Sequence, residues 1–310
     1  MSIYTALILL LVITGVLYVV VCFIFSGLLI YSHRQPVVTS PREYGMDYED
    51  IEFKSTDGLT LKGWFIPGTS KKVVIVTHPF PFNRHGFSTE NQGWITRLKI
   101  DVDLLKTAQA LNRVGFSVLM FDFRNHGESE RGITAVGLNE YQDVLGALTY
   151  IRNHPNLKSC TIGFVSFCMG ANSTIVAMGK AKEQFGNVKC LIAIQPISMI
   201  VFIRSFVKQV YTPLGLVLIP LVDKLCQWRG GYPFREITPL LYCKDIPVPT
   251  MYVQARTDPW TELSDIEGFF KATPEPKEFW MIEGEMERFD TYNYVGEHPE
   301  KMVDFLKKYL

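Results

Sequence analysis

The sequence predicts an α/β domain with a mainly parallel sheet flanked by helices, a helical cap inserted into it and a transmembrane helix in front of it. Short apolar runs of β character alternate with segments of helical spacing from residue 49 onward. The first 32 residues carry no charged side chain, and two apolar segments interrupt the alternation of strands and helices near residues 196–243. These features divide the chain into an anchor (1–32), a linker (33–48) and a domain (49–310) with a cap insertion at about 196–243.

The N-terminal segment has the length and composition of a membrane-spanning helix. Residues 3–31 are almost wholly apolar or small, and they exceed the roughly 20 residues that cross a bilayer. A cleaved signal peptide is the alternative, but no positive region precedes the segment, the apolar stretch is too long, and no convincing small-x-small site precedes His33. Because Arg34 and Arg42 follow the span, we expect a single-pass membrane protein whose domain faces the cytoplasm.

The charge balance and the cysteine pattern exclude several classes of protein. The chain has 31 basic and 31 acidic residues and no basic tract, so we expect no nucleic-acid partner. Its six cysteines show neither CxxC spacing nor the density of a disulfide scaffold, and we expect reduced thiols. Neither metal-ligand spacing nor a glycine-rich nucleotide loop occurs, so we expect no metal and no cofactor.

The strands of the domain are predicted from β-rich runs bounded by turns. Residues 49–55 and 59–65 are predicted to form a hairpin around the turn Thr56-Asp57-Gly58. Continuous apolar runs after this hairpin are typical of strands that helices cover on both faces. The predicted later strands are residues 73–77, 117–122, 160–165, 188–195, 248–254 and 277–282.

The helices are predicted from apolar spacing and from their end signals. Residues 101–113 have helical spacing and stop before Gly115, and residues 169–179 begin at a sharp turn. The remaining helices are predicted at residues 138–153, 262–271 and 299–309, with apolar cap segments at 199–210 and 214–225.

Four motifs along the domain occur in the order of one known family. They are His78-Pro79-Phe80, Asp122-Phe123-Arg124-Asn125-His126-Gly127-Glu128-Ser129, Asp245-Ile246-Pro247-Val248-Pro249-Thr250 and Asp258-Pro259. Through them, nearly all of residues 50–310 resembles the α/β-hydrolases. The resemblance implies that family's fold and a triad of nucleophile, acid and histidine. It places the acid at Asp258, although this aspartate could instead only cap the helix that follows.

The nucleophile of the resemblance falls on a cysteine. Such a nucleophile occupies a tight strand-to-helix turn, and the residues two before and two after it must be small. The run Ser166-Phe167-Cys168-Met169-Gly170 meets this rule with Cys168 at its apex, whereas a turn centred on Ser166 does not. A thiol at a helix N-terminus readily becomes a nucleophilic thiolate, although Cys168 could also be a buried structural thiol. The resemblance places the oxyanion hole at the backbone N–H groups of Met169 and Phe80.

The histidine of the triad is missing from its expected place. The family pattern is Gly-x-x-His, and here Gly284-Glu285-Met286-Glu287 carries Glu287. A carboxylate beside Cys168 would oppose the thiolate, which makes Glu287 a poor base. The other candidate bases are His298 and the loop histidines His78, His85 and His126. His78 and His126 could instead bind only backbone groups.

Two functional hypotheses follow from these features. The first is a cofactor-free, membrane-anchored hydrolase or acyltransferase that acts on an acyl ester, thioester or lactone through Cys168. The second is an inactive relative that binds an apolar ligand or a protein partner in the same pocket. The elbow and Asp258 favour the first, and Glu287 favours the second. The apolar cap favours an apolar or acyl small molecule, unless its helices only pack on the core or rest on the bilayer.

Overall fold

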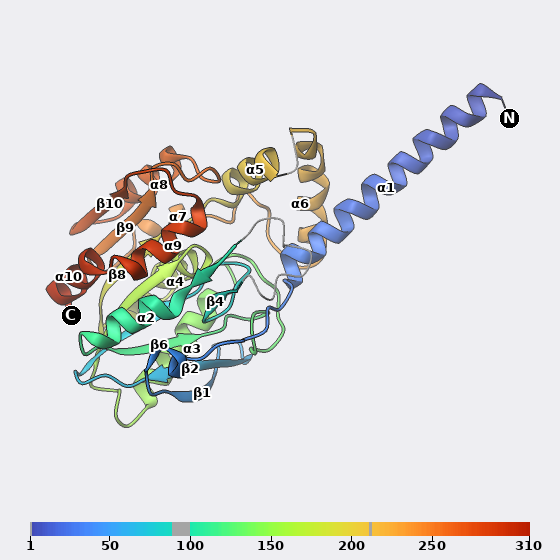
Figure 1. The fold of residues 1–310 in the computed structure, drawn as a ribbon. Coiled ribbons are helices and arrows are strands. Elements are labelled where there is room, and N and C mark those ends of the chain that lie inside the picture. Colours follow the sequence, from blue (N-terminus) through green and yellow to red (C-terminus); the bar gives the residue numbers. More distant parts are fainter. Residues whose placement is uncertain (1, 89–99, 211–212) are drawn as a thin grey trace.

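The computed structural model describes residues 2–88, 100–210 and 213–310. Residue 1 of the predicted anchor and residues 211–212 of the predicted cap lie outside the described residues. Helix α1 (Ile3–Tyr31) projects from the domain without interruption (Figure 1). Within the described ranges it is the one helix that is long and apolar enough to cross a membrane, and only 6% of its most apolar part is buried.

Eight strands form the central sheet, in the order β1-β2-β6-β3-β7-β8-β9-β10. Strand β2 is antiparallel to its neighbours β1 and β6, and the strands from β6 to β10 are parallel. The bounds are β1 (Glu49–Lys54), β2 (Thr60–Ile66), β3 (Lys72–Thr77), β6 (Ser117–Phe121), β7 (Thr161–Phe167), β8 (Val188–Ile194), β9 (Thr250–Ala255) and β10 (Lys277–Ile282). The predicted sheet and its initial hairpin are confirmed.

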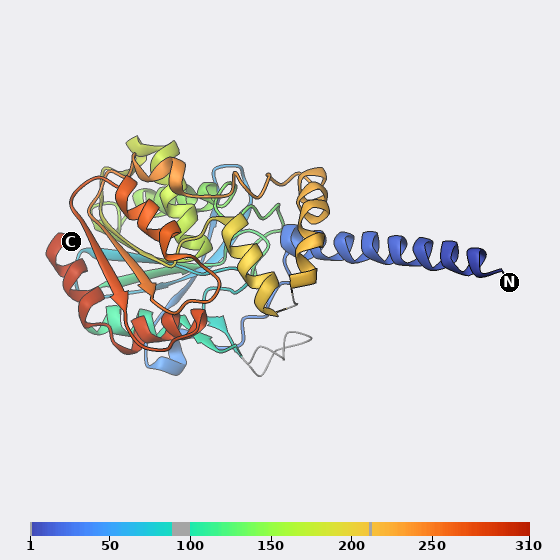
Figure 2. The same ribbon diagram turned by 90° about the horizontal axis from the view of Figure 1, so that it is seen from above.

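Helices cover both faces of this sheet, as Figures 1 and 2 show. One face carries α2 (Leu104–Arg113), α9 (Arg288–Glu297) and α10 (Glu300–Tyr309). The other face carries α3 (Tyr141–Asn153), α4 (Met169–Lys180), α7 (Leu240–Cys243) and α8 (Leu263–Ala272). The cap consists of α5 (Met199–Val210), the 3-10 helix η5 (Pro213–Leu218) and α6 (Ile219–Trp228), and two further 3-10 helices are η1 (Pro41–Tyr44) and η4 (Lys182–Phe185).

The central strands are buried on both faces because helices lie on each side of them. Every residue from Val73 to Val76 in β3 and from Val118 to Phe121 in β6 is at most 1% exposed. Burying one such side chain contributes about 1.5–3 kcal/mol. This double burial explains why these strands read as continuous apolar runs rather than as alternating ones.

Helix α9 and the start of α2 differ from the predicted elements. Residues 102–103 form a short strand, β5 (Val102–Asp103), which pairs with β4 (Gly86–Phe87), so α2 begins only at Leu104. Helix α9 fills the segment where the sequence predicted only a loop. A capping box between Glu287 and Asp290 starts it, and its buried residues recur at helical spacing.

The C-terminal half of α1 packs against the cap. The Tyr18 hydroxyl donates a hydrogen bond to the backbone carbonyl of Val217 at 3.0 Å. The Arg229 side chain donates to Oγ of Ser26 at 3.1 Å, and its guanidinium lies 4.1 Å from the centroid of the Phe23 ring. The buried residues on this face of α1 are Cys22, Ser26 and Ile30.

The segment predicted as a linker, residues 33–48, follows the surface of the domain. The Arg34 side chain donates to the backbone carbonyls of Gly127, at 3.0 Å, and Ser129. Nδ2 of Asn83 donates to the carbonyls of Gln35 at 3.2 Å and Pro36 at 3.0 Å. The anchor, this segment and the domain therefore form a continuous set of contacts, which a freely pivoting tether would not show.

Candidate active site

Cys168 lies at the sharp turn between β7 and α4. Its backbone has a φ of 48° and a ψ of −107°, a combination that non-glycine residues adopt only where the surrounding structure enforces it. The Cys168 N–H donates to the carbonyl of Ile194 at 2.8 Å, which ties the turn to β8. Because Cys168 is the N-cap residue of α4, the turn has the geometry of a nucleophile elbow with the cysteine at its apex.

The two small residues around Cys168 have different roles. A Cβ atom on Gly170 would lie 2.3 Å from Oγ1 of Thr77, at the end of β3, so only glycine fits there. Ser166 is fully buried, and its Oγ lies 3.0 Å from Oγ1 of Thr174 in α4. The side chain of Ser166 is therefore engaged inside the fold, in β7, two residues before the apex that Cys168 occupies.

Arg288 links Asp258 to the neighbourhood of Cys168, the place that a triad histidine would take. Its Nη1 donates to Oδ2 of Asp258 at 2.5 Å, and its Nη2 donates to the carbonyl of Gln195 at 2.7 Å. The side chains of Arg288 and Asp258 are only 2% and 1% exposed. The Cys168 side chain interacts with the same guanidinium.

The surroundings of Arg288 keep it protonated. Burial alone lowers the pKa of Arg288, but Tyr292 and Asp258 raise it by more, and the pKa lies above its ordinary value. Burial also raises the pKa of Tyr292 well above its usual range, so this phenol stays neutral. The site therefore contains a permanent cation that accepts no proton at physiological pH.

Asp258 is held by several donors in addition to Arg288. Its Oδ2 accepts hydrogen bonds from Oγ1 of Thr261 at 2.8 Å and from Nε2 of Gln195 at 3.2 Å. Its Oδ1 accepts from the backbone N–H of Trp260 at 3.0 Å. This last bond is the local turn contact expected of a capping aspartate, while the bond to Arg288 joins Asp258 to the site.

Glu287 and His298 are both exposed on the surface of the domain. Glu287 caps α9 in the capping box with Asp290. His298 lies at the C-terminal end of α9, where its ring is 4.3 Å from that of Tyr294. A role of either side chain as the base for Cys168 stays a prediction.

The loop histidines are engaged with the backbone. Nδ1 of His78 lies 2.9 Å from the carbonyl of Pro79, and its Nε2 accepts from the N–H of Phe123 at 3.0 Å. Nδ1 of His126 lies 2.8 Å from the carbonyl of Arg124. Burial lowers the pKa of His78 to about 3 and that of His126 to about 3, so both rings are neutral. Both therefore match the alternative in which they only hold loops.

His85 also contacts a backbone carbonyl. Its Nε2 lies 3.4 Å from the carbonyl of Pro36, and burial lowers its pKa. Across the described ranges, no group of three or more histidine, cysteine, aspartate or glutamate side chains could hold a metal ion.

The predicted oxyanion donors are the backbone N–H groups of Met169 and Phe80. Met169 is the first residue of α4, where backbone N–H groups point out of the helix end. Neither amide has a hydrogen-bond partner among the residues that the structure describes. Both can therefore donate to a substrate, and their role in an oxyanion hole stays a prediction.

Several buried polar atoms of the site region lack a partner in the described part of the chain. They are Oγ1 of Thr77, Oε1 of Gln195, Nε1 of Trp260 and the hydroxyl of Tyr292. Each such atom destabilises a fold by about 1–3 kcal/mol unless something binds it. Tyr292 lies one turn after Arg288 among the buried residues of α9, so its hydroxyl is available to a polar group of a ligand.

The cap covers this region with aromatic rings. Phe202 of α5 lies 5.4 Å from the Arg288 guanidinium and 5.9 Å from the Trp260 ring. Phe206, one turn further along α5, lies 5.0 Å from the same Trp260 ring. Cys168 is only 4% exposed. The site is therefore enclosed, with an apolar wall on the side of the cap.

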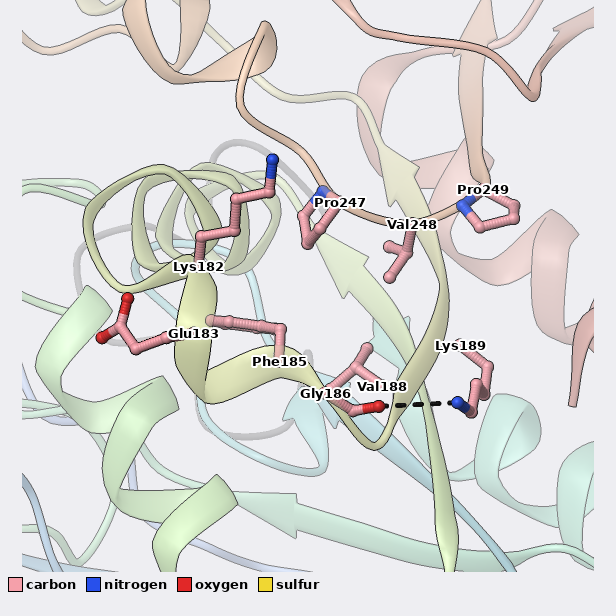
Figure 3. Close-up of a pocket in the computed structure, with 9 residues that line it drawn as sticks. All are labelled: Lys182, Glu183, Phe185, Gly186, Val188, Lys189, Pro247, Val248 and Pro249. Carbon is pink, nitrogen blue, oxygen red and sulfur yellow. Dashed lines mark hydrogen bonds between the residues drawn. The ribbon is translucent and has the colours of Figure 1, made fainter.

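A surface pocket of about 460 Å³ lies at the other end of the sheet (Figure 3). It is lined by Lys182, Glu183, Phe185, Gly186, Val188, Lys189, Pro247, Val248 and Pro249. Strands β8 and β9 begin beside it, whereas Cys168 follows the end of β7, and these three strands are parallel. The pocket is therefore separate from the Cys168 site.

Sequence comparison finds distant relatives. No family model matches the chain. The chain is 23% identical to the uncharacterized protein YqkD of Bacillus subtilis, over 74% of this chain and 69% of that protein. It is 30% identical to a polyketide transferase of Aspergillus fumigatus and 26% identical to a thiohydrolase of Aspergillus aculeatus, over 43% and 53% of this chain. These matches cover only 41% and 46% of the two fungal proteins.

Structure comparison identifies the fold. An esterase of Pyrococcus furiosus aligns with a TM-score of 0.66 and 24% identity, over 89% of this chain and 98% of that one. An α/β hydrolase of Penicillium aligns with a TM-score of 0.61 and 20% identity, over 85% of this chain and 99% of that one. Together with the strand order and the elbow, these likenesses define a protein of the α/β-hydrolase fold. Its similar proteins include an esterase, a thiohydrolase and a polyketide transferase.

Proposed function

We propose that this protein is a membrane-anchored enzyme that transfers or hydrolyses the acyl group of a thioester, with Cys168 as the nucleophile. The observation that carries the proposal is the buried Arg288 between Asp258 and Cys168. In an ordinary triad, a histidine takes the proton of the nucleophile and later gives it to the leaving group. A guanidinium does neither, so the reaction must proceed without proton transfer by this residue.

A thioester meets this requirement. The nucleophilic form of cysteine is the thiolate, which forms when the Cys168 thiol gives its proton to water. The thiolate attacks the carbonyl carbon; a bond from Sγ of Cys168 to that carbon forms, and the bond from the carbon to the substrate sulfur breaks. The electron pair leaves with the substrate sulfur as a second thiolate, which needs no general acid as the bond breaks and afterwards takes a proton from water. The N–H groups of Met169 and Phe80 would bind the transient oxyanion.

Oxygen esters and lactones fit this site less well. Their leaving group is an alkoxide, which must receive a proton as the bond breaks. Arg288 keeps its proton, and Glu287 and His298 are exposed, whereas Cys168 is buried. We therefore favour thioesters among the three substrate classes, and transfer to a second thiol over release to water, because water also needs a base to become a nucleophile.

The names of two similar proteins support the same chemistry. One is a thiohydrolase and another a polyketide transferase. The chain matches less than half of the length of each, so neither their substrates nor their acceptors are carried over. What they support is an acyl thioester as the class of substrate.

We also propose that α1 is a single membrane span and that the domain lies in the cytoplasm. The 29 residues of α1 exceed the roughly 20 that cross a bilayer. Arg34 and Arg42 follow the span, as expected on the cytoplasmic side. All six cysteines are free and buried, which suits a reducing compartment.

The test is acylation of the full-length protein in nanodiscs by a short-chain acyl thioester and by the matching oxygen ester. Peptide mass spectrometry locates the adduct. We expect the thioester, and not the oxygen ester, to acylate Cys168. Cys168→Ala should abolish the adduct and Ser166→Ala should retain it. Arg288→Met should slow acylation strongly, whereas Arg288→Lys, which keeps a cation, should retain part of the rate.

Two outcomes would contradict this proposal. Equal acylation by both esters would show that a proton donor acts at the site, against the argument from Arg288. The absence of any adduct in a protein whose circular dichroism shows it to be folded would exclude a covalent mechanism. That second result would favour an inactive relative that binds an apolar ligand, a function to which the 4% exposure of Cys168 and the lack of a base also point.

A further inference from the structure

The cap runs alongside α1, and η5 is its end nearest the start of that helix. The hydroxyl of Tyr18 bonds to the carbonyl of Val217 in η5. Further along both segments, the Arg229 side chain at the end of α6 reaches Ser26. The cap therefore follows α1 from η5 back toward the domain, and Figure 1 shows α6 beside the base of α1.

The part of α1 that lies beyond the cap is too short to cross a bilayer. The helix begins at Ile3, where the Ser2 side chain caps it. Residues 3–17, which precede Tyr18, extend about 22 Å at a rise of about 1.5 Å per residue. The hydrocarbon core is about 30 Å thick and takes about 20 residues, or more when the helix is tilted. The core must therefore reach to about Cys22, whose Sγ lies 3.8 Å from the carbonyl of Leu218 in η5.

The end of the cap that contains η5 has an apolar surface, which suits the hydrocarbon core of a bilayer. Residues 213–222 include no charged side chain. Within η5, Leu214 is 80% exposed and Val217 is 62% exposed, and the carbonyl of Val217 accepts the hydrogen bond from Tyr18 of α1. At the other end of α6, Trp228 is 73% exposed with its ring 6.5 Å from that of Phe23. A tryptophan followed by Arg229 is typical of the headgroup region of a bilayer.

We propose that η5 and the start of α6 enter the same leaflet as α1 and contact lipid acyl chains directly. The proposal rests on the proposed membrane span of α1. Two observations favour a bilayer as the occupant of this face. The part of α1 beyond the cap is too short to cross a bilayer alone, and α1 and η5 both expose apolar side chains. Because α5 leads from this end of the cap to Phe202, beside Arg288, one end of the cap touches lipid and the other covers the site.

Photolabelling from the bilayer tests this proposal without altering the protein. Full-length wild-type protein is placed in nanodiscs that contain a phosphatidylcholine with a diazirine on its acyl chain, irradiated and digested with trypsin. Cleavage after lysine and arginine separates residues 1–34, residues 209–224 with η5, and residues 236–244. The last peptide is the matched control, because it carries Leu241, which is 64% exposed on α7, a helix that packs against α4 and α8.

We expect label on residues 1–34 and on residues 209–224, and none on residues 236–244. Label on residues 1–34 alone would overturn the proposal while leaving the membrane span intact, since η5 would then face water or another protein. The absence of label from residues 1–34 would refute the span itself. Equal label on both cap-side and control peptides would show unspecific adsorption of lipid to exposed leucines and would also overturn the proposal.

Discussion

Arg288 gives the site its electrostatic character. It shares a fully buried ion pair with Asp258 and places positive charge near Cys168. Truncating one member of such a pair commonly costs about 3–5 kcal/mol, because the other is left as an uncompensated charge. The variant Arg288→Met in the acylation test therefore requires its own control of folding, and Arg288→Lys supplies a milder change.

At the same scale, the sequence singled out Glu287 and did not single out Arg288, which is buried against Asp258. The spacing Gly-x-x-His pointed to Glu287, and the adjacent Arg288 turns inward instead. The residue at which a helix begins determines which of its residues lie on the buried face. The spacing of Glu287 and Asp290 is that of a capping box, and Arg288, Thr291 and Tyr292 recur as one helical face. These two signals together could have identified Arg288.

Two buried histidines make stability depend on pH. Burial lowers the pKa of His78 to about 3 and that of His126 to about 3, below the ordinary value of 6.5. Between pH 6.5 and 3 the unfolded chain binds protons that the folded one does not, so the free energy of unfolding falls as the pH falls. Each histidine contributes up to about 1.4 kcal/mol per pH unit.

The measurement is the free energy of unfolding between pH 7 and 5 for wild type and His126→Gln. Asp143 acts in the opposite sense, because burial raises its pKa to about 6, so the difference between the two proteins isolates His126. We expect a shallower loss of stability in the variant. His298→Gln, at an exposed position, is the control. Identical slopes for wild type and His126→Gln would contradict the neutral buried ring.

At the scale of elements, the elbow joins β7 to α4 through a close approach to β3. Replacing Gly170 by alanine would put a Cβ 2.3 Å from Oγ1 of Thr77. We expect Gly170→Ala to destabilise the protein by about 1–3 kcal/mol and to displace Cys168, with loss of acylation. Gly186→Ala is the matched control, since no atom lies within 4 Å of its added Cβ. Thermal unfolding and the acylation assay compare the two, and equal behaviour would refute the steric argument.

The sequence predicted correctly those elements whose burial is visible in the local pattern of apolar residues. Apolar runs identify β3 and β6 because helices cover these strands on both faces. The start of α2 was misplaced because residues 102–103 pair with Gly86–Phe87, a contact that local spacing does not encode. Tertiary pairing of this kind overrides helical propensity.

At the scale of the molecule, α1 and the domain form one packed unit. The apolar composition of α1 predicted a span, but its contacts with η5 and α6 join residues about 200 positions apart in the chain and follow from no local pattern. Arg34, which the sequence offered only as a topological signal, also bonds to the loop carbonyls of Gly127 and Ser129. The segment predicted as a linker between α1 and the domain therefore packs against the domain.

Deleting residues 1–44 should therefore destabilise the domain. Ile219, Val222 and Cys226 of α6 are at most 9% exposed and would lose the cover that α1 provides. Re-exposing each apolar side chain costs on the order of 1–2 kcal/mol. We expect a lower unfolding temperature in detergent for residues 45–310 than for the full chain. Deleting only residues 3–17, which leaves the contacts from Tyr18 onward, should not lower it, and equal unfolding temperatures for all three proteins would contradict the packed unit.

The anchor is attached at the same edge of the sheet as the nucleophile. The loop after β6 bonds to the end of α1, where Nδ2 of Asn125 and the N–H of Thr134 donate to the carbonyl of Ile30 at 3.2 and 3.0 Å. Cys168 follows β7, which is parallel to β6 with β3 between them in the sheet. With the proposed membrane span and the proposed activity, the protein would meet membrane-resident substrates by lateral diffusion in two dimensions. Its rate would then follow the mole fraction of substrate among the lipids rather than the bulk concentration, and adding inert lipid at a constant amount of substrate would slow it.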